Sequence, residues 1–281
     1  MRMDVYCVKC IISQMTELIK IIGADRKTEE SIMREVLKLL AKESYDTTSP
    51  ELAEKVYDLA RRISGIDDPY QEIKRLENQK AEEIVRTFEE NMDRLSLEDI
   101  LKLSVLGNSM DYGTEARFNI EEEKEKLMHE RLNPEILKEL EKELREGEKL
   151  LIIGDNAGEI VFDRLLVRYI RQNYETKITY AVRGGPIIND ATMEDAKQVG
   201  MDKYAELITT GQNIAGLVLE RSSKEIIEAF KNSPTVLSKG QGNFETLEGK
   251  GLDIYFLFRV KCPVVSSYLN KPMGEMVFLR R

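Results

Sequence analysis

Two pairs of oxygen-bearing side chains follow short, strand-like runs of this sequence, the first directly and the second after a Gly-Gly-Pro loop. Asp155 and Asn156 follow the apolar run at 150–153, and Asn189 and Asp190 follow the next such run along the chain. In an open α/β sheet, ligands bind outside the carboxyl ends of the strands, so the two pairs point to one shared site. Carboxylate and amide oxygens suit a hard divalent cation, and a helix N-terminus suits a phosphate.

A structural alternative exists for these residues, because Asp and Asn are also favoured helix caps. The presence of Asp190 at a second strand end favours metal binding for Asp155 and Asn156, since three oxygen donors form one face of an octahedral shell. Glu159 and Asp163 lie one turn apart in the helix that follows. The helix dipole alone accounts for carboxylates in a first turn, so these two residues are weaker candidates.

A third strand-like run ends in a glycine-containing loop with a cation. Lys239 precedes Gly240 and Gly242, and Asn243 follows. Glycines let a ligand approach the backbone closely, and an ammonium group offsets phosphate charge. The structural alternative is a flexible turn. We expect Lys239 to bind phosphate and Asn243 to help orient a substrate.

These three segments together resemble the metal-dependent damage-control phosphatases, a family once labelled domain of unknown function 89. The segments that carry the resemblance are residues 154–159, 186–192 and 239–245, and they occur in the family's order. Residues 107–113 match the family's Gly-Asn-x-x-Asp segment more weakly. The pair Cys7 and Cys10 is similar to the N-terminal cysteine pair of the prokaryotic branch.

The resemblance implies hydrolysis of small phosphate monoesters, either sugar phosphates or phosphopantetheine-like metabolites. It implies a divalent metal cofactor, Mn²⁺ or Mg²⁺, with Ni²⁺ and Co²⁺ as further candidates. The implied metal ligands are Asp155, Asn156 and Asp190; the implied catalytic residues are Asp155, Asp190 and Lys239; the implied substrate contacts are Asn108, Asp111, Glu159, Lys239 and Asn243. The resemblance favours a ligand role for Asp155, and direct attack on phosphorus by this carboxylate stays open.

The single histidine restricts the chemistry independently. His129 lies in a charged helical stretch outside the three segments, where we expect a solvent-exposed side chain. A Ser-His-Asp or Cys-His triad would have to use it, and a zinc site with several histidines cannot be built. A catalytic metal would therefore be held mainly by oxygen ligands, which favours Mg²⁺ or Mn²⁺.

The three cysteines give no clear site. Cys7 and Cys10 form a CxxC pair, and Cys262 is distant in sequence. Three thiols fall short of the four ligands of a structural zinc site, and no strand precedes the pair as in a redox motif. At this spacing on a helix, we expect both residues of the pair to face the core. A reducing cytoplasm is the simpler expectation for such a chain.

Composition excludes several partners. The 281 residues carry a net charge of −9, which argues against nonspecific nucleic-acid binding. No apolar run approaches the length of a membrane span, and no signal peptide is recognised. We expect a small-molecule phosphate as the partner; the oligomeric state does not follow from the sequence.

The pattern of apolar residues along the sequence changes near residue 148. Up to about residue 147, apolar residues recur at helical spacing, as in Ile32, Val36 and Leu39. Beyond it, helical patterns alternate with short apolar runs, at 150–153, 178–182, 207–209, 235–237 and 254–258. This alternation predicts an α/β fold with a doubly wound, mainly parallel sheet. We expect a helical N-terminal domain at 1–147 and an α/β metal- and phosphate-binding domain at 148–281.

Two other functions fit parts of the pattern. A strand followed by Gly-Asp-Asn-Ala-Gly also suits the crevice of an S-adenosylmethionine-dependent methyltransferase. That alternative explains Asp190 and Lys239 less readily. A non-catalytic metal- or nucleotide-binding module is the third possibility. A phosphatase assay with and without Mn²⁺, together with a methyl-donor binding test, distinguishes the three functions.

Overall fold

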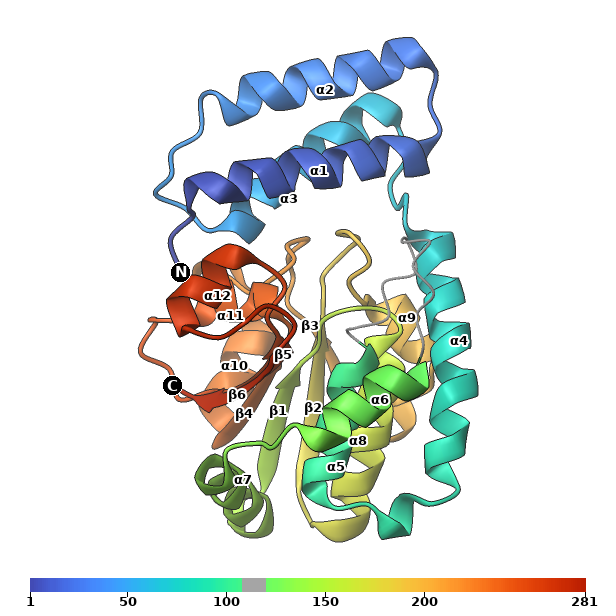
Figure 1. The fold of residues 1–281 in the computed structure, drawn as a ribbon, viewed down its shortest axis with the longest axis vertical. Helices are drawn as coiled ribbons and strands as arrows, with labels where there is room; N and C mark the ends of the chain where they lie inside the picture. The colour runs from blue at the N-terminus through green and yellow to red at the C-terminus, as the bar shows by residue number, and fades with distance from the viewer. Residues whose placement is uncertain (108–119) are drawn as a thin grey trace.

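A six-stranded sheet forms the centre of the computed structural model, which describes residues 1–107 and 120–281 (Figure 1). The strands are β1 (Lys149–Ile153), β2 (Lys177–Val182), β3 (Glu206–Thr209), β4 (Thr235–Lys239), β5 (Tyr255–Arg259) and β6 (Met276–Arg280). Their order is β3-β2-β1-β4-β5-β6, and only the pair β5 and β6 is antiparallel. The predicted α/β class with a mainly parallel sheet is confirmed, with β6 as an additional edge strand.

The connections place a topological switch point at the centre of the sheet. From β1 the chain continues to β2 and β3 on one side, and it then returns to β4 on the other side of β1. The loops that leave β1 and β4 therefore diverge from neighbouring carboxyl ends. In doubly wound sheets a ligand crevice forms at this point.

Helices make up nearly all of the described N-terminal half and alternate with the strands thereafter. Those of the N-terminal half are α1 (Val5–Ile22), α2 (Arg26–Leu40), α3 (Ser49–Ser64), α4 (Gln71–Glu89), α5 (Leu97–Leu106), α6 (Ile120–His129) and α7 (Pro134–Glu146). Those of the C-terminal half are α8 (Glu159–Asn173), α9 (Met193–Gln198), α10 (Lys224–Asn232), α11 (Gln241–Leu247) and α12 (Pro263–Leu269). The expected helical character up to residue 147 is confirmed for the described residues.

Several helices begin where the sequence places caps. Thr48 forms a capping box with Glu51 at the start of α3, and Pro50 occupies the first turn. The side chain of Asn133 accepts hydrogen bonds from two amides at the start of α7. Local side-chain hydrogen bonds to the backbone thus mark where these two helices begin.

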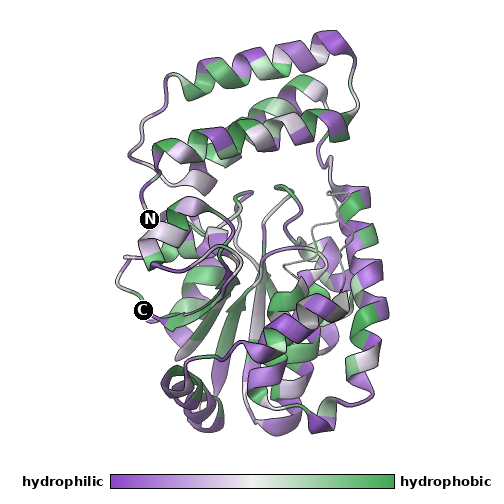
Figure 2. Ribbon diagram, viewed as in Figure 1, coloured by the Kyte–Doolittle hydropathy of each residue, from purple (hydrophilic) through white to green (hydrophobic). Residues whose placement is uncertain are grey.

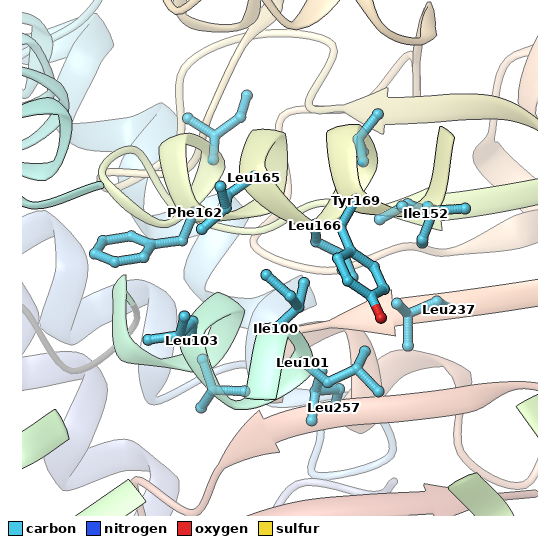
Figure 3. Packing of buried hydrophobic residues seen from close by; sticks show 14 of the residues in the cluster. Ile100, Leu101, Leu103, Ile152, Phe162, Leu165, Leu166, Tyr169, Leu237 and Leu257 are labelled. Carbon is cyan, nitrogen blue, oxygen red and sulfur yellow. The ribbon is translucent and has the colours of Figure 1, made fainter. Parts of the chain in front are cut away.

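The side chains of successive residues in each strand lie on opposite faces of the sheet. Ile152 of β1 and Leu237 of β4 belong to the same buried cluster as α5 and α8, seen from close by in Figure 3. The adjacent Leu151 and Val236 belong to a second cluster, which includes residues of α10, α11 and α12. Helices therefore cover both faces, as a doubly wound fold requires.

The first three helices form a layer with a core of their own. Their cluster includes Ile11, Met15, Ile32 and Val36, and it takes in Ile187 from the loop after β2. In Figure 1 this layer lies across the end of the sheet from which that loop emerges. The α1–α3 layer is therefore packed against the predicted site region.

The other N-terminal helices share the core of the sheet. Residues of α4 and α5, such as Val85 and Ile100, pack in one cluster with α8 and β1. Figure 2 shows the apolar residues concentrated toward this centre, whereas α7 is largely hydrophilic. The boundary at 147 stays a prediction, and buried contacts run across it. Within the described ranges, no helix combines the length and apolar character needed to cross a membrane.

Candidate functional site

The loops after β1 and β2 are joined by backbone hydrogen bonds. Asn156 and Asp190 form an isolated antiparallel bridge, and the amide of Ala191 donates to the carbonyl of Asp155 at 2.8 Å. These bonds place Asp155, Asn156 and Asp190 side by side at the carboxyl edge of the sheet. The convergence expected from the two strand ends is thus present, while the role of these residues as metal ligands stays a prediction.

A strained turn sets the direction of the second loop. Ile188 has a φ of 45°, which a β-branched residue rarely adopts. The turn is held by the amide of Asp190, which donates to the carbonyl of Ile187 at 3.0 Å. Because Ile187 is buried in the α1–α3 layer, the packing of that layer supports the strain. Asp190 is therefore positioned by contacts on both sides of its loop.

Arg183, which the sequence analysis did not single out, connects the predicted residues. Its Nε donates to Oδ2 of Asp190 at 2.6 Å, and its Nη2 donates to Oδ1 of Asp155 at 3.2 Å. Its Nη1 donates to Oδ1 of Asn243 and to the carbonyl of Gly216, both at 2.9 Å. The residue is 1% exposed. The signal available in the sequence was a lone cation between an apolar strand and Gly-Gly.

Burial dominates the electrostatics of Asp190. It raises the pKa of this carboxyl to about 7, and the neighbouring charge of Asp155 acts in the same direction. Arg183 opposes the shift, as does Lys261 to a smaller degree. Lys261 is exposed just beyond β5, so its charge reaches the site from the solvent side.

Gly240, at the end of β4, is required by the close approach of Asp155. Its φ of 81° and ψ of 150° lie in a region that is nearly exclusive to glycine. A Cβ at this position would lie 2.1 Å from Cγ of Asp155. Any side chain would therefore displace the carboxylate.

We expect Gly240→Ala to lower the free energy of unfolding more than Gly249→Ala does. Gly249 has a similar φ of 77°, and a Cβ there would meet nothing within 4 Å. The control should cost about 1–2 kcal/mol through backbone strain. The clash at Gly240 should add about 1–3 kcal/mol. Urea denaturation of both variants measures the difference, and equal losses would mean that Asp155 moves aside without cost.

Lys239 lies in a fully buried ionic cluster. Its Nζ donates to Oε1 of Glu159 and to Oδ1 of Asp163, both at 2.6 Å, and to the carbonyl of Ser104 at 3.0 Å. The hydroxyl of Tyr180 donates to the second oxygen of Asp163 at 2.7 Å. An ammonium group has three donors, and all three are used here. Direct contact with a phosphate would require the cluster to open.

The carboxyl groups of this cluster have raised pKa values. Burial raises the pKa of Glu159 to about 8, and Lys239 pulls it back toward its usual range. Burial also raises the pKa of Asp163, again opposed by Lys239. Glu159 and Asp163 are therefore buried ion-pair partners of Lys239. Interaction with the dipole of α8 does not by itself account for them.

Asn243 is fully buried and uses its amide within the protein. Its Nδ2 donates to the carbonyls of Lys239 and Gly154, at 2.7 and 3.1 Å, while its Oδ1 accepts from Arg183. These contacts tie the start of α11 to the end of β4 and to the loop after β1. The other expected substrate contacts, Asn108 and Asp111, lie outside the described residues.

Amides at the start of α8 already have protein partners. The amide of Gly158 donates to Oδ1 of Asn78 at 2.7 Å, and those of Ala157 and Ile160 donate to the carbonyls of Asn189 and Asn156. These three amides do not supply the phosphate contacts expected at this helix start.

The remaining expectations concern residues away from the site. Cys7 is buried but Cys10 is exposed, so the expectation that both face the core is wrong for Cys10. His129 is exposed, as expected. A cavity of about 760 Å³ lies near the amino ends of β1 and β2, lined by Lys149 and Lys177 among others. It is at the opposite edge of the sheet and does not bear on the site.

The donor set fits a hard divalent cation. Among the described residues, no cluster of three or more His, Cys, Asp or Glu side chains is arranged to hold a metal. The candidate set is instead two carboxylates and an amide, from Asp155, Asp190 and Asn156, so every donor is an oxygen. Oxygen donors from few side chains, with room for water and phosphate, are typical of Mg²⁺ and Mn²⁺ sites.

Known proteins match the chain along its whole length. A family model described as the damage-control phosphatase ARMT1-like domain matches residues 3–277. The chain is 35% identical to damage-control phosphatase PH1575 of Pyrococcus horikoshii, over 100% of this chain and 98% of that protein. It is 33% identical to a damage-control phosphatase of Archaeoglobus fulgidus, over 99% and 98% of the two chains. The crystal structure of PH1575, titled as a DUF89 family protein, superposes with a TM-score of 0.92 at 33% identity, covering 100% and 99% of the chains.

Proposed function

The chain belongs to the family of damage-control phosphatase ARMT1-like domains, and on that premise we propose how it works: it is a metal-dependent phosphatase that acts on small phosphate monoesters. The observation that supports this mechanism best is the convergence of Asp155, Asn156 and Asp190 at the switch point of the sheet. Sugar phosphates and phosphopantetheine-like metabolites are the substrate classes that we propose.

We propose that Asp155, Asn156 and Asp190 hold the metal, with Mn²⁺ or Mg²⁺ as the preferred ion and Ni²⁺ or Co²⁺ as alternatives. When bound, the ion supplies Lewis-acid stabilisation of the charge that develops on the phosphoryl oxygens. Asp155 acts as a ligand, held in place by Arg183. Its carboxylate lies against the backbone of Gly240, where a side chain would displace it.

Cations around these carboxylates prepare the site for an anionic substrate. The exposed Lys261 is the proposed contact for the substrate phosphate, because its amide donates to Oε1 of Gln241, the residue after Gly240, which places it beside the site. Lys239 is fully buried and does not line the proposed metal site; its ammonium offsets the negative charge of Glu159 and Asp163. In this proposal Lys239 affects phosphate turnover through the position of Glu159, and a direct contact follows only if the cluster opens.

Chelation should remove the phosphatase activity of the full chain. With p-nitrophenyl phosphate as the substrate, we expect exhaustive EDTA treatment to lower the rate by about 100-fold or more, because several kcal/mol of transition-state stabilisation are lost. Added Mn²⁺ or Mg²⁺ should restore it. Circular dichroism of the chelated protein checks that it stays folded. Activity that survives chelation would contradict the metal mechanism.

The same preparation tests the alternatives. A methyltransferase would bind S-adenosylmethionine in a calorimetric titration and show no metal-dependent hydrolysis. A non-catalytic module would bind Mn²⁺ and hydrolyse nothing. We also propose a cytoplasmic location, because the three cysteines, all within the described ranges, are free, as is usual in a reducing compartment.

A further inference from the structure

Arg183 occupies the centre of the site without being able to bind a metal. A guanidinium group has five N–H donors and no lone pair to offer. In this structure it contacts Asp155, Asp190 and the carbonyl of Gly216, which come from the loops after β1, β2 and β3, and Asn243, which lies in α11 after β4. Arg183 therefore links these segments directly through its hydrogen bonds.

We propose that Arg183 is a positioning residue that holds Asp155 and Asp190 at the spacing and orientation required for a divalent cation. This inference rests on the proposed metal site. The guanidinium contacts Oδ1 of Asp155 and Oδ2 of Asp190, and thereby fixes the rotation of both carboxylates. We assign the other oxygen of each carboxylate to the metal: Oδ1 of Asp190, and Oδ2 of Asp155, which here accepts from Nδ2 of Asn156 at 3.1 Å.

The charge of Arg183 serves the same purpose. Two carboxylates buried side by side repel each other, and the cation between them offsets one of the two charges. The two carboxylates and the guanidinium together carry a net charge of −1 when ionised. With a divalent cation held there, the net charge of these groups would become +1, which would attract a phosphate dianion. Without the arginine, the same site would be neutral after metal binding.

The planar shape of the guanidinium is as important as its charge. Its Nε and Nη2 contact different carboxylates, while Nη1 is anchored by two oxygens, one from Asn243 and one from Gly216. A lysine has the same charge but a single nitrogen at the end of a flexible stem. It cannot make these contacts at four separate acceptors. Replacement by lysine therefore separates geometry from charge.

The test is a calorimetric titration of Mn²⁺ alone into the full, chelator-treated chain. We expect Arg183→Lys to weaken Mn²⁺ binding by about 10- to 100-fold, the usual loss when a partner of a metal ligand is removed. Arg164→Lys is the matched control. Arg164, on α8, also pairs with two carboxylates, Glu82 and Glu89 of α4, and the contact is partly buried. Thermal unfolding in EDTA should show a lower stability for both variants, and only Arg183→Lys should lose Mn²⁺ affinity.

A second variant keeps the inference testable if Arg183→Lys does not fold. Asn243→Ala removes one anchor of Nη1 and leaves both carboxylates and the guanidinium in place. We expect about a 10-fold loss of Mn²⁺ affinity, at the lower end of the same range. Unchanged affinity in every folded variant would overturn the positioning role and leave the proposed function intact. A wild-type chain that binds no Mn²⁺ would overturn both.

Discussion

Asp190→Ala is expected to abolish tight metal binding and phosphatase activity together. Asp190 supplies one of two carboxylates in the proposed set, so its loss should exceed the roughly 10- to 100-fold effect of removing a partner of a ligand. Titration of Mn²⁺ and a p-nitrophenyl phosphate assay measure the two losses. Unchanged affinity would mean that Asp190 serves only the local structure of its loop.

The same variant should also lower the stability of the metal-free protein. From sequence alone, removing a carboxylate relieves repulsion with Asp155 and spares the fold. The structure adds the buried contact with Arg183, so truncation leaves a guanidinium with one partner fewer, and breaking a buried pair costs about 3–5 kcal/mol. Asp190→Asn keeps the shape and an acceptor for Arg183, and should lose the metal with a smaller loss of stability.

A matched control for these effects lies five residues further along the chain. Asp195 is also a buried carboxylate paired with a cation, Lys74, at 2.9 Å. We expect Asp195→Asn to lower stability while leaving Mn²⁺ affinity unchanged. A loss of metal binding in this control would show that the titration reports general loosening of the fold rather than the removal of a ligand.

Lys239→Met should destabilise the protein by about 3–5 kcal/mol, because it leaves two buried carboxyl groups without their cation. Lys74→Met is the matched control. Lys74 also pairs with two carboxylates, but the side chain of Asp68 is 17% exposed, so water relieves part of the loss. Urea denaturation in EDTA measures both. Adding Glu159→Gln and Asp163→Asn to Lys239→Met should restore part of the stability.

The deficit of Lys239→Met relative to the wild type should grow as pH rises above 8. Burial raises the folded-state pKa of Glu159 in the wild type to about 8, from an ordinary value of 4.5, and removal of the lysine raises it further. From pH 5 to pH 8 both folded proteins keep a proton that the unfolded chain has lost, so both lose stability in parallel; above pH 8 the wild-type carboxyl ionises, and only the variant goes on losing stability. A stable Lys239→Met variant with a raised KM alone would instead place the ammonium on the substrate, as the sequence motif implies.

Sequence patterns predicted the elements that carry strong local signals. The run at 150–153 became β1 and the run at 235–237 became part of β4, because near-continuous apolar runs are typical of buried parallel strands. The strand β6, at 276–280, was not predicted. It is the antiparallel edge strand and lacks the following helix that marked the others.

Partners distant in sequence account for what local patterns did not reveal. Helical periodicity shows that α5 has a buried face, but it does not show that the carbonyl of Ser104 will accept from Lys239. A Lys-Gly motif likewise does not disclose that the lysine is buried beside Asp163. The central place of Arg183 depends on three loops and the start of α11 meeting, and the sequence around Arg183 does not indicate which acceptors its guanidinium will reach.

The separate core of the α1–α3 layer has a consequence for the order in which the chain is made. These helices leave the ribosome before any strand of the sheet, and their own cluster can form early. Their apolar contacts with Ile187, Ala215 and Val264 must then wait for segments synthesised more than a hundred residues later. The nascent layer therefore exposes an apolar face for most of translation, which makes it the segment where chaperone binding or aggregation during synthesis is expected.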